Sequence, residues 1–100
     1  MYRIVYDKQA VRDIQNLKSA KLDEKAKELI EIVRRNPFQN PPPYEKLVGN
    51  LSRFYSRRIN IQHRFVYLVY EEKVIDDNGD TEYNGTVKIV SMWSHYDKAR

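Results

Sequence analysis

Residues 50–70 read NLSRFYSRRINIQHRFVYLVY, and this stretch decides the fold. Its two halves, residues 54–59 and 63–70, are rich in Phe, Tyr, Val and Ile, as β-strands are. Residues 60–62 between them are mostly polar and predict a turn. The stretch therefore predicts a pair of neighbouring strands at the centre of a sheet.

Arginines occur among the bulky side chains of both strands. Because side chains alternate across a strand, Ser56 and Arg58 are expected on one face and Tyr55 and Arg57 on the other. Burial of an unpartnered guanidinium is costly. Either these arginines extend to the edge of the sheet, or one face of the sheet is open to an anionic ligand. We favour the second interpretation.

The segment before this strand pair predicts a strand and two helices. Residues 2–6 alternate and are rich in Tyr, Ile and Val, which indicates a strand. Asp7 offers an N-cap to a helix that ends near residue 19, with an apolar stripe of Val11, Ile14 and Leu17. A second helix is expected from about residue 22 to residue 35, with an apolar stripe of Ala26, Leu29, Ile30 and Val33.

The remaining segments complete an α+β fold. Residues 36–44, NPFQNPPPY, predict a rigid connector that holds Glu45 and Lys46 in place without regular secondary structure. An Asn-Gly pair at residues 78–79 predicts a hairpin turn, and residues 86–93 predict the last strand. The expected order is βααβββ in one domain, residues 1–100. The helical hairpin packs on one face of a mostly antiparallel sheet, and the other face is partly exposed.

Composition excludes several classes of protein. The chain has no cysteine, which excludes disulfides and a cysteine nucleophile. No apolar run approaches the roughly 20 residues that span a bilayer, and the first residues lack the apolar region of a signal peptide, so we expect a cytoplasmic protein without a membrane partner. Residues 71–82 carry six acidic and one basic side chain, a local charge of −5, which leaves +9 on the remainder of a chain whose net charge is +4. A basic surface with Phe and Tyr among its cations favours nucleic acid over mere solubility.

The side chains available for chemistry fit one reaction. RNA can be cut through its own 2′-OH when a general base, a cation at the phosphate and a general acid are present. Glu45, the strand arginines and His95 could supply these groups, whereas His63 is expected to be structural. There is no Gly-rich phosphate loop, and metal ligation is weakly supported, so no cofactor or metal is expected.

The string NPF…PPPYEKLVGNLSRFYSRRINIQHRFVYLVY, together with the terminal Ser-His-Tyr of residues 94–96, resembles the YoeB/Txe family of bacterial toxins in the RelE superfamily. The resemblance covers nearly the whole chain. It implies a microbial-ribonuclease-like fold and a ribosome-dependent, metal-independent mRNA endoribonuclease. It also implies inhibition by a cognate YefM-like antitoxin.

The family's functional residues are matched one by one. Glu45 matches the general base, Arg64 the arginine that stabilises the phosphate, and His95 the general acid. The remaining expected substrate-binding residues are Arg58, Tyr96, Lys46 and Arg57. The family's type member has lysine where Val48 stands and glutamate where Gln62 stands, and it ends at its His-Tyr pair, whereas residues 97–100 follow here. Lys46 could partly replace the missing lysine.

Two other functions remain open from the sequence. One is a non-catalytic RNA- or ribosome-binding module, and the other is a degenerate toxin that represses transcription together with its antitoxin. A general acid and a general base favour catalysis, because binding alone needs neither. The expected partners are the antitoxin and mRNA in the ribosomal decoding site, with operator DNA reached only through the antitoxin. Whether the chain forms a homodimer or a toxin–antitoxin hetero-oligomer is left open.

Overall fold

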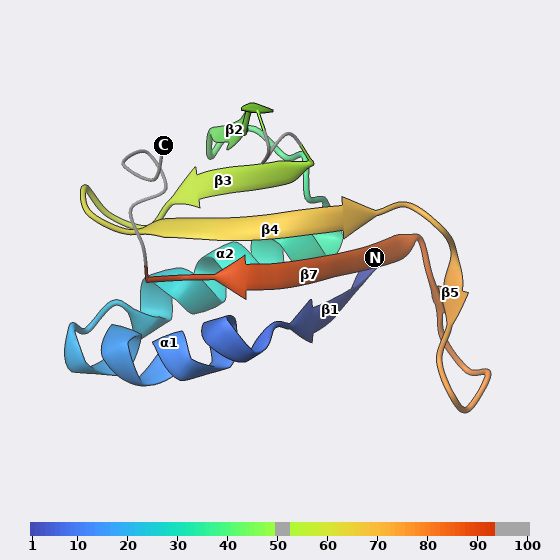
Figure 1. Cartoon of the computed structure of the whole chain (residues 1–100). Helices are drawn as coiled ribbons and strands as arrows, with labels where there is room; N and C mark the ends of the chain where they lie inside the picture. Colours follow the sequence, from blue (N-terminus) through green and yellow to red (C-terminus); the bar gives the residue numbers. More distant parts are fainter. Residues whose placement is uncertain (50–52, 94–100) are drawn as a thin grey trace.

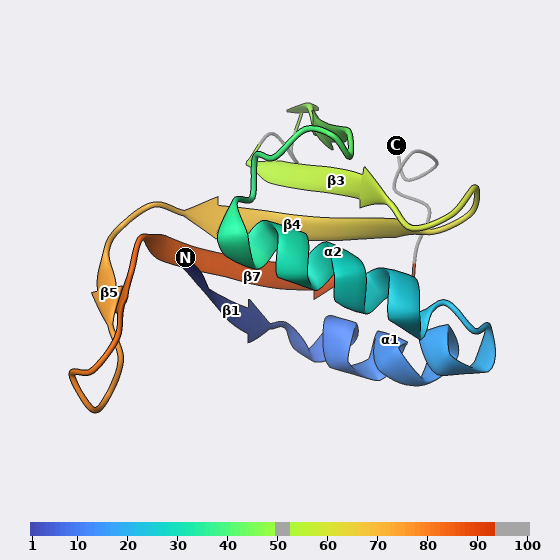
Figure 2. The ribbon, with the colours of Figure 1, turned by 180° about the vertical axis from the view of Figure 1, so that it is seen from behind.

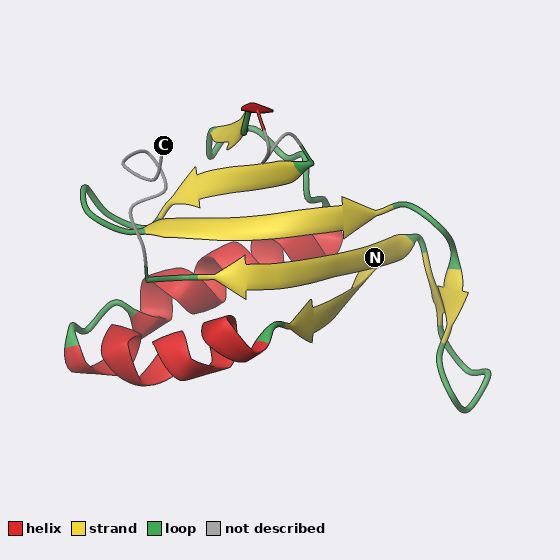
Figure 3. Ribbon diagram, in the orientation of Figure 1, coloured by secondary structure: helices red, strands yellow, loops and turns green. Residues whose placement is uncertain are grey.

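The computed structural model describes residues 1–49 and 53–93. Its elements are β1 (Tyr2–Tyr6), α1 (Lys8–Ser19), α2 (Asp23–Arg35), β2 (Tyr44–Lys46), β3 (Phe54–Arg58), β4 (Arg64–Tyr70), β5 (Val74–Ile75), β6 (Glu82–Tyr83) and β7 (Gly85–Ser91). Five strands form one sheet in the order β1-β7-β4-β3-β2 (Figures 1 and 3). β1 runs parallel to β7, and every other neighbouring pair is antiparallel.

The expected α+β architecture is confirmed. α1 and α2 form a hairpin that packs on one face of the sheet, and Figure 2 shows α2 in front of β4 and β7, with α1 below the strands. β5 and β6 form a separate two-stranded sheet that projects beyond the end of β4 and β7 (Figure 1). At its turn the N–H of Gly79 donates to Asp76 O at 2.9 Å with φ +75° at Gly79, so the predicted hairpin is present. Neither helix is long and apolar enough to cross a membrane.

The structure adds a strand that the sequence did not predict. Residues 44–46 were expected to be held without regular secondary structure, yet they pair with β3 as β2. The prolines end at residue 43, so the backbone donors return at Tyr44, and the N–H of Leu47 donates to Phe54 O at 2.9 Å. Glu45 is therefore carried by an edge strand.

The core lies between the helices and the sheet. Leu17, Leu29, Phe65 and Ile89 are each at most 1% exposed. On α2, Ala26, Leu29 and Val33 are buried, as the predicted stripe requires.

The predicted buried face of α1 is wrong in part. Val11 is 54% exposed and Ile14 36% exposed, and the buried residues are Ala10, Asp13 and Leu17. The helix is rotated toward Asp13 because one carboxylate oxygen accepts from the N–H of Met92 at 2.8 Å and the other from Gln9 Nε2 at 2.8 Å. A buried polar group that is fully hydrogen-bonded can thus occupy a position that periodicity assigns to an apolar side chain.

Candidate active site

Three strands carry the candidate site on the face of the sheet opposite the helices. In the register of the sheet, Glu45 on β2 lies opposite Ser56 on β3, and Ser56 lies opposite Val66 on β4. One row further along, Arg58 lies opposite Arg64. Alternation of side chains therefore places Glu45, Ser56, Arg58 and Arg64 on the same face.

The carboxylate of Glu45 and the guanidinium of Arg64 are in contact. Arg64 Nη1 donates to Glu45 Oε1 at 3.2 Å and forms an ion pair with it. The Arg64 side chain is 17% exposed, whereas the Glu45 side chain is 66% exposed, so the arginine is held by its surroundings and the carboxylate reaches into solvent. A pocket of about 170 Å³ is lined by these two residues together with Arg58, Ser56, Pro43 and Tyr44.

The two arginines give this pocket a charge that suits an anion. Like charges directly opposite each other on neighbouring strands repel, and Glu45 neutralises only one of them. A phosphate offers oxygens to both guanidinium groups and would offset that repulsion. The pocket thus combines a solvent-accessible carboxylate with two cations, all three of them residues that the sequence proposed for the site.

Other predicted site residues lie elsewhere. Lys46 is exposed and lies opposite Tyr55, so alternation points it to the other face of β2, and it does not line the pocket. His95 and Tyr96 lie outside the described residues, as do Asn50 and Leu51 of the sequence motif. Their roles remain predictions. Val48 is 84% exposed.

The prediction that Arg57 contacts substrate is contradicted by its burial. Arg57 is 1% exposed, on the face of β3 that packs toward the helices. Its Nη1 donates to Pro42 O at 2.6 Å, and its Nη2 donates to Pro37 O at 3.0 Å and Gln39 O at 2.9 Å. Backbone carbonyls compensate the buried cation, so for Arg57 neither of the two alternatives considered for the strand arginines holds.

Tyr67 completes this buried network. Arg57 Nε donates to the Tyr67 hydroxyl at 3.1 Å, and that hydroxyl donates to Pro37 O at 2.7 Å. Burial raises the pKa of Tyr67 to about 12, although the charge of Arg57 acts in the opposite direction. The phenol therefore stays protonated and keeps its hydrogen bond to the connector. A signal for this contact was present in the sequence, because prolines offer carbonyls without matching N–H groups.

His63 has the structural position that the sequence predicts. Its side chain is 7% exposed and its ring stacks on Trp93, with ring centroids 3.8 Å apart. This contact joins the start of β4 to the residues that follow β7, so the last described residue lies beside the strand that carries Arg64.

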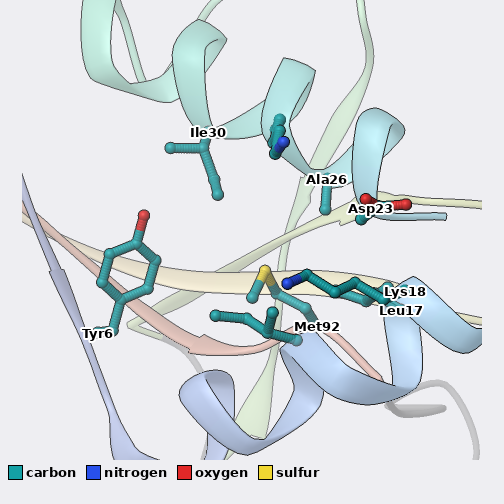
Figure 4. Close-up of a pocket in the computed structure, with 9 residues that line it drawn as sticks. Tyr6, Leu17, Lys18, Asp23, Ala26, Ile30 and Met92 are labelled. Carbon is teal, nitrogen blue, oxygen red and sulfur yellow. The ribbon is translucent and has the colours of Figure 1, made fainter.

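A second pocket lies on the opposite side of the molecule. It measures about 190 Å³ between the two helices and β1, and Figure 4 shows Tyr6, Leu17, Ala26, Ile30 and Met92 around it. Its charged lining residues, Lys18, Asp23 and Lys27, belong to the helices. Apart from Tyr6, its other lining residues are apolar, whereas the pocket of Glu45 and Arg64 is lined mainly by charged and polar side chains, so the second of these suits a phosphate better.

Comparisons with known proteins agree with this fold. The family model of the YoeB-like toxin of bacterial type II toxin-antitoxin systems matches residues 6–96. Toxin YoeB of Escherichia coli K12 is 44% identical over 52 residues, which cover 52% of this chain and 62% of that protein. The chain thus matches less than two thirds of the length of this curated relative.

Solved structures match over nearly the whole chain. A YoeB/ParE toxin from Agrobacterium tumefaciens superimposes with a TM-score of 0.75 at 26% identity, covering 94% of this chain and 99% of that one. A chain of the YoeB–YefM complex from Staphylococcus aureus superimposes with a TM-score of 0.67 at 33% identity, covering 96% and 99% of the two chains. The chain described here belongs to the family of YoeB-like toxins of bacterial type II toxin-antitoxin systems.

Proposed function

We propose that this toxin is a metal-independent endoribonuclease that cuts mRNA on the ribosome. The observation that carries the proposal is the ion pair between Glu45 and Arg64 beside Arg58, in one pocket on the open face of the sheet. Glu45 removes the proton of the 2′-OH, and the 2′ oxygen attacks the adjacent phosphorus. Arg64 and Arg58 stabilise the negative charge that develops on the phosphate oxygens.

The reaction then needs a general acid for the leaving 5′ oxygen, and we assign this role to His95, with Tyr96 beside it. The assignment rests on the family resemblance, because both residues lie outside the described ones. Trp93, the last described residue, stacks on His63, which is the neighbour of Arg64. The bond from phosphorus to the 5′ oxygen breaks, leaving a 2′,3′-cyclic phosphate and a 5′-OH.

The proposal is tested by removing the nucleophile from the substrate. One ribose is replaced by deoxyribose immediately 5′ of the scissile phosphate, in mRNA loaded on an assembled ribosome. This change leaves the phosphate charge intact, so binding survives while cutting stops. Efficient cutting of the deoxy substrate, or a product with a 5′-phosphate, would identify water as the nucleophile and overturn the proposal. If neither substrate is cut although both bind, the chain is a non-catalytic RNA- or ribosome-binding module.

We further propose that a YefM-like antitoxin inhibits the toxin by covering the basic face with an acidic segment. The relative from Staphylococcus aureus is described in a YoeB–YefM complex and as a YoeB dimer, which supports an antitoxin and leaves a homodimer open. Charge attraction speeds the encounter of such partners, so association should slow as salt rises. An association rate that is independent of salt, or a complex that leaves Arg58 and Arg64 exposed, would contradict this model of inhibition.

A further inference from the structure

We propose that Arg57 is a positioning residue that fixes the proline connector and thereby sets the place of Glu45. The inference rests on the proposed function for its catalytic consequence, but its structural part stands on the described contacts alone. Arg57 does not itself line the pocket, since it lies buried on the opposite face of β3, although it packs against Tyr44, which does line it. It can therefore act on the reaction only through other residues.

The contacts of Arg57 span the connector from end to end. Its guanidinium donates to the carbonyls of Pro37, Gln39 and Pro42, and its Nε to Tyr67. Four of the roughly five N–H donors that a guanidinium has are thus used. Residues 41–43 are prolines, so they have no N–H with which to join a strand ladder. Arg57 supplies the donors that a neighbouring strand would otherwise provide.

The connector leads directly into β2, the strand that carries Glu45. Pro42 comes three residues before Glu45 in the chain. Tyr44 lies opposite Arg57 in the sheet, and the guanidinium carbon is 5.0 Å from the centre of the Tyr44 ring. Arg57 therefore holds both the backbone that enters β2 and the first side chain of β2. β2 is an edge strand of three residues, so its own ladder is too short to fix Glu45 without this support.

Stability alone does not account for an arginine at this position. Buried charges are expensive, and replacing them by apolar side chains of similar volume is often neutral or stabilising. A methionine could fill much of the same volume but could not bind three carbonyls at once. What the arginine adds is a fixed geometry of the connector, because its planar fork directs each donor.

The test compares Arg57→Lys with wild type, with Arg12→Lys on the exposed face of α1 as the control for a conservative change elsewhere. Single-turnover cleavage of ribosome-bound mRNA is measured over a range of toxin concentrations. Displacement of a catalytic group by about 1 Å can cost about 100-fold in rate. We expect Arg57→Lys to lower the maximal rate by roughly 10- to 100-fold. The half-saturating concentration should change by less than about threefold, because Arg58 and Arg64 still bind the phosphate.

Two further measurements separate positioning from general loss of structure. If Arg57 acts through Glu45, the double variant Arg57→Lys/Glu45→Gln should be no slower than Glu45→Gln alone. Independent, multiplying losses would overturn the proposal. Backbone amides of residues 44–47 should exchange with deuterium about 10-fold faster in Arg57→Lys, while those of β4 and β7 stay protected. Unchanged exchange of residues 44–47 would also overturn it.

If Arg57→Lys fails to fold, Tyr67→Phe tests the same positioning role. It removes one hydroxyl from the network and leaves Arg57 in place, so we expect a smaller loss of rate, about 3- to 10-fold, with the same fast exchange at residues 44–47. Wild-type rates and exchange in Tyr67→Phe would then contradict the proposal. Failure of the proposed function is distinguishable, because wild type itself would leave mRNA intact while the exchange measurement still tests the contact between Arg57 and the connector.

Discussion

Replacing Glu45 by glutamine should separate catalysis from binding. Glutamine has nearly the same shape but carries no charge and does not act as a base. The Glu45 side chain is 66% exposed, so its ion pair with Arg64 is open to solvent on the carboxylate side and the fold should not depend on it. Removal of a general base costs about 10²- to 10⁴-fold in rate. We expect a loss of cleavage in that range.

Binding should change in the opposite direction. A phosphate held by Arg58 and Arg64 would lie about 5 Å from the carboxylate, and at an effective dielectric constant of about 60 their repulsion is about 1 kcal/mol. Loss of the carboxylate also frees Arg64 from its ion pair at 3.2 Å. Glu45→Gln should therefore bind a non-cleavable substrate about 5-fold more tightly.

The assay uses the same ribosome-bound mRNA in two forms. Cleavage is measured as a single turnover on normal mRNA, and binding is measured on mRNA with the single deoxyribose. Glu31→Gln is the matched control, because Glu31 is 61% exposed on α2 and pairs with Arg34 at 3.3 Å, far from the pocket. It should cut and bind as wild type does. If Glu45→Gln cuts within threefold of wild type, or binds more weakly, the role assigned to Glu45 is wrong.

Three further predictions concern single side chains. Arg64→Ala should lose more cleavage than Arg64→Lys, because lysine keeps the charge but not the planar fork, and equal losses accompanied by unfolding would mark Arg64 as structural. The raised pKa of Tyr67, about 12 against an ordinary value of 10.0, stabilises the fold below pH 10, and this contribution disappears as the pH rises from about 10 to 12. In urea denaturation between pH 9 and 11, wild type should thus lose roughly 1 kcal/mol more stability than Tyr67→Phe, and equal losses would contradict the assignment. Gly85→Ala should lower the free energy of unfolding by about 2 kcal/mol, because its Cβ would lie 2.1 Å from Tyr70 O, and an unchanged urea midpoint would show that the strands can shift apart.

The local sequence pattern predicted secondary structure correctly where apolar residues are buried and polar residues cap a helix. The β-branched and aromatic residues of β3 and β4 predicted the central strand pair, and Asp7 predicted the start of α1, where its side chain accepts from the N–H of Lys8 at 2.8 Å. On α1 the same reasoning failed, since a hydrogen-bonded Asp13 took the buried position and left Val11 exposed. Periodicity carries no information about a distant N–H group such as that of Met92.

The candidate site, too, was predicted in part from the sequence and in part not. The resemblance of the sequence named Glu45, Arg58 and Arg64, and alternation along β3 placed Ser56 and Arg58 on one face. From the sequence, Arg57 was also assigned to substrate binding, because nothing in the sequence distinguishes the roles of adjacent arginines. Only the packing of the connector beneath β3 showed that this guanidinium is used by the carbonyls of Pro37, Gln39 and Pro42.

By itself, the sequence determined the kinds of side chain available, the two helices and the central strands, because these depend on neighbours a few residues apart. The tertiary structure alone decided which of them meet. Glu45 and Arg64 are 19 residues apart in the chain, and their ion pair exists because β2 adds to the edge of β3 in one register. A shift of one residue would turn Glu45 to the other face, away from both arginines. The register depends on pairing between β2 and β3, whose residues are about 10 or more positions apart in the chain. A pattern of neighbouring residues carries no information about such distant contacts.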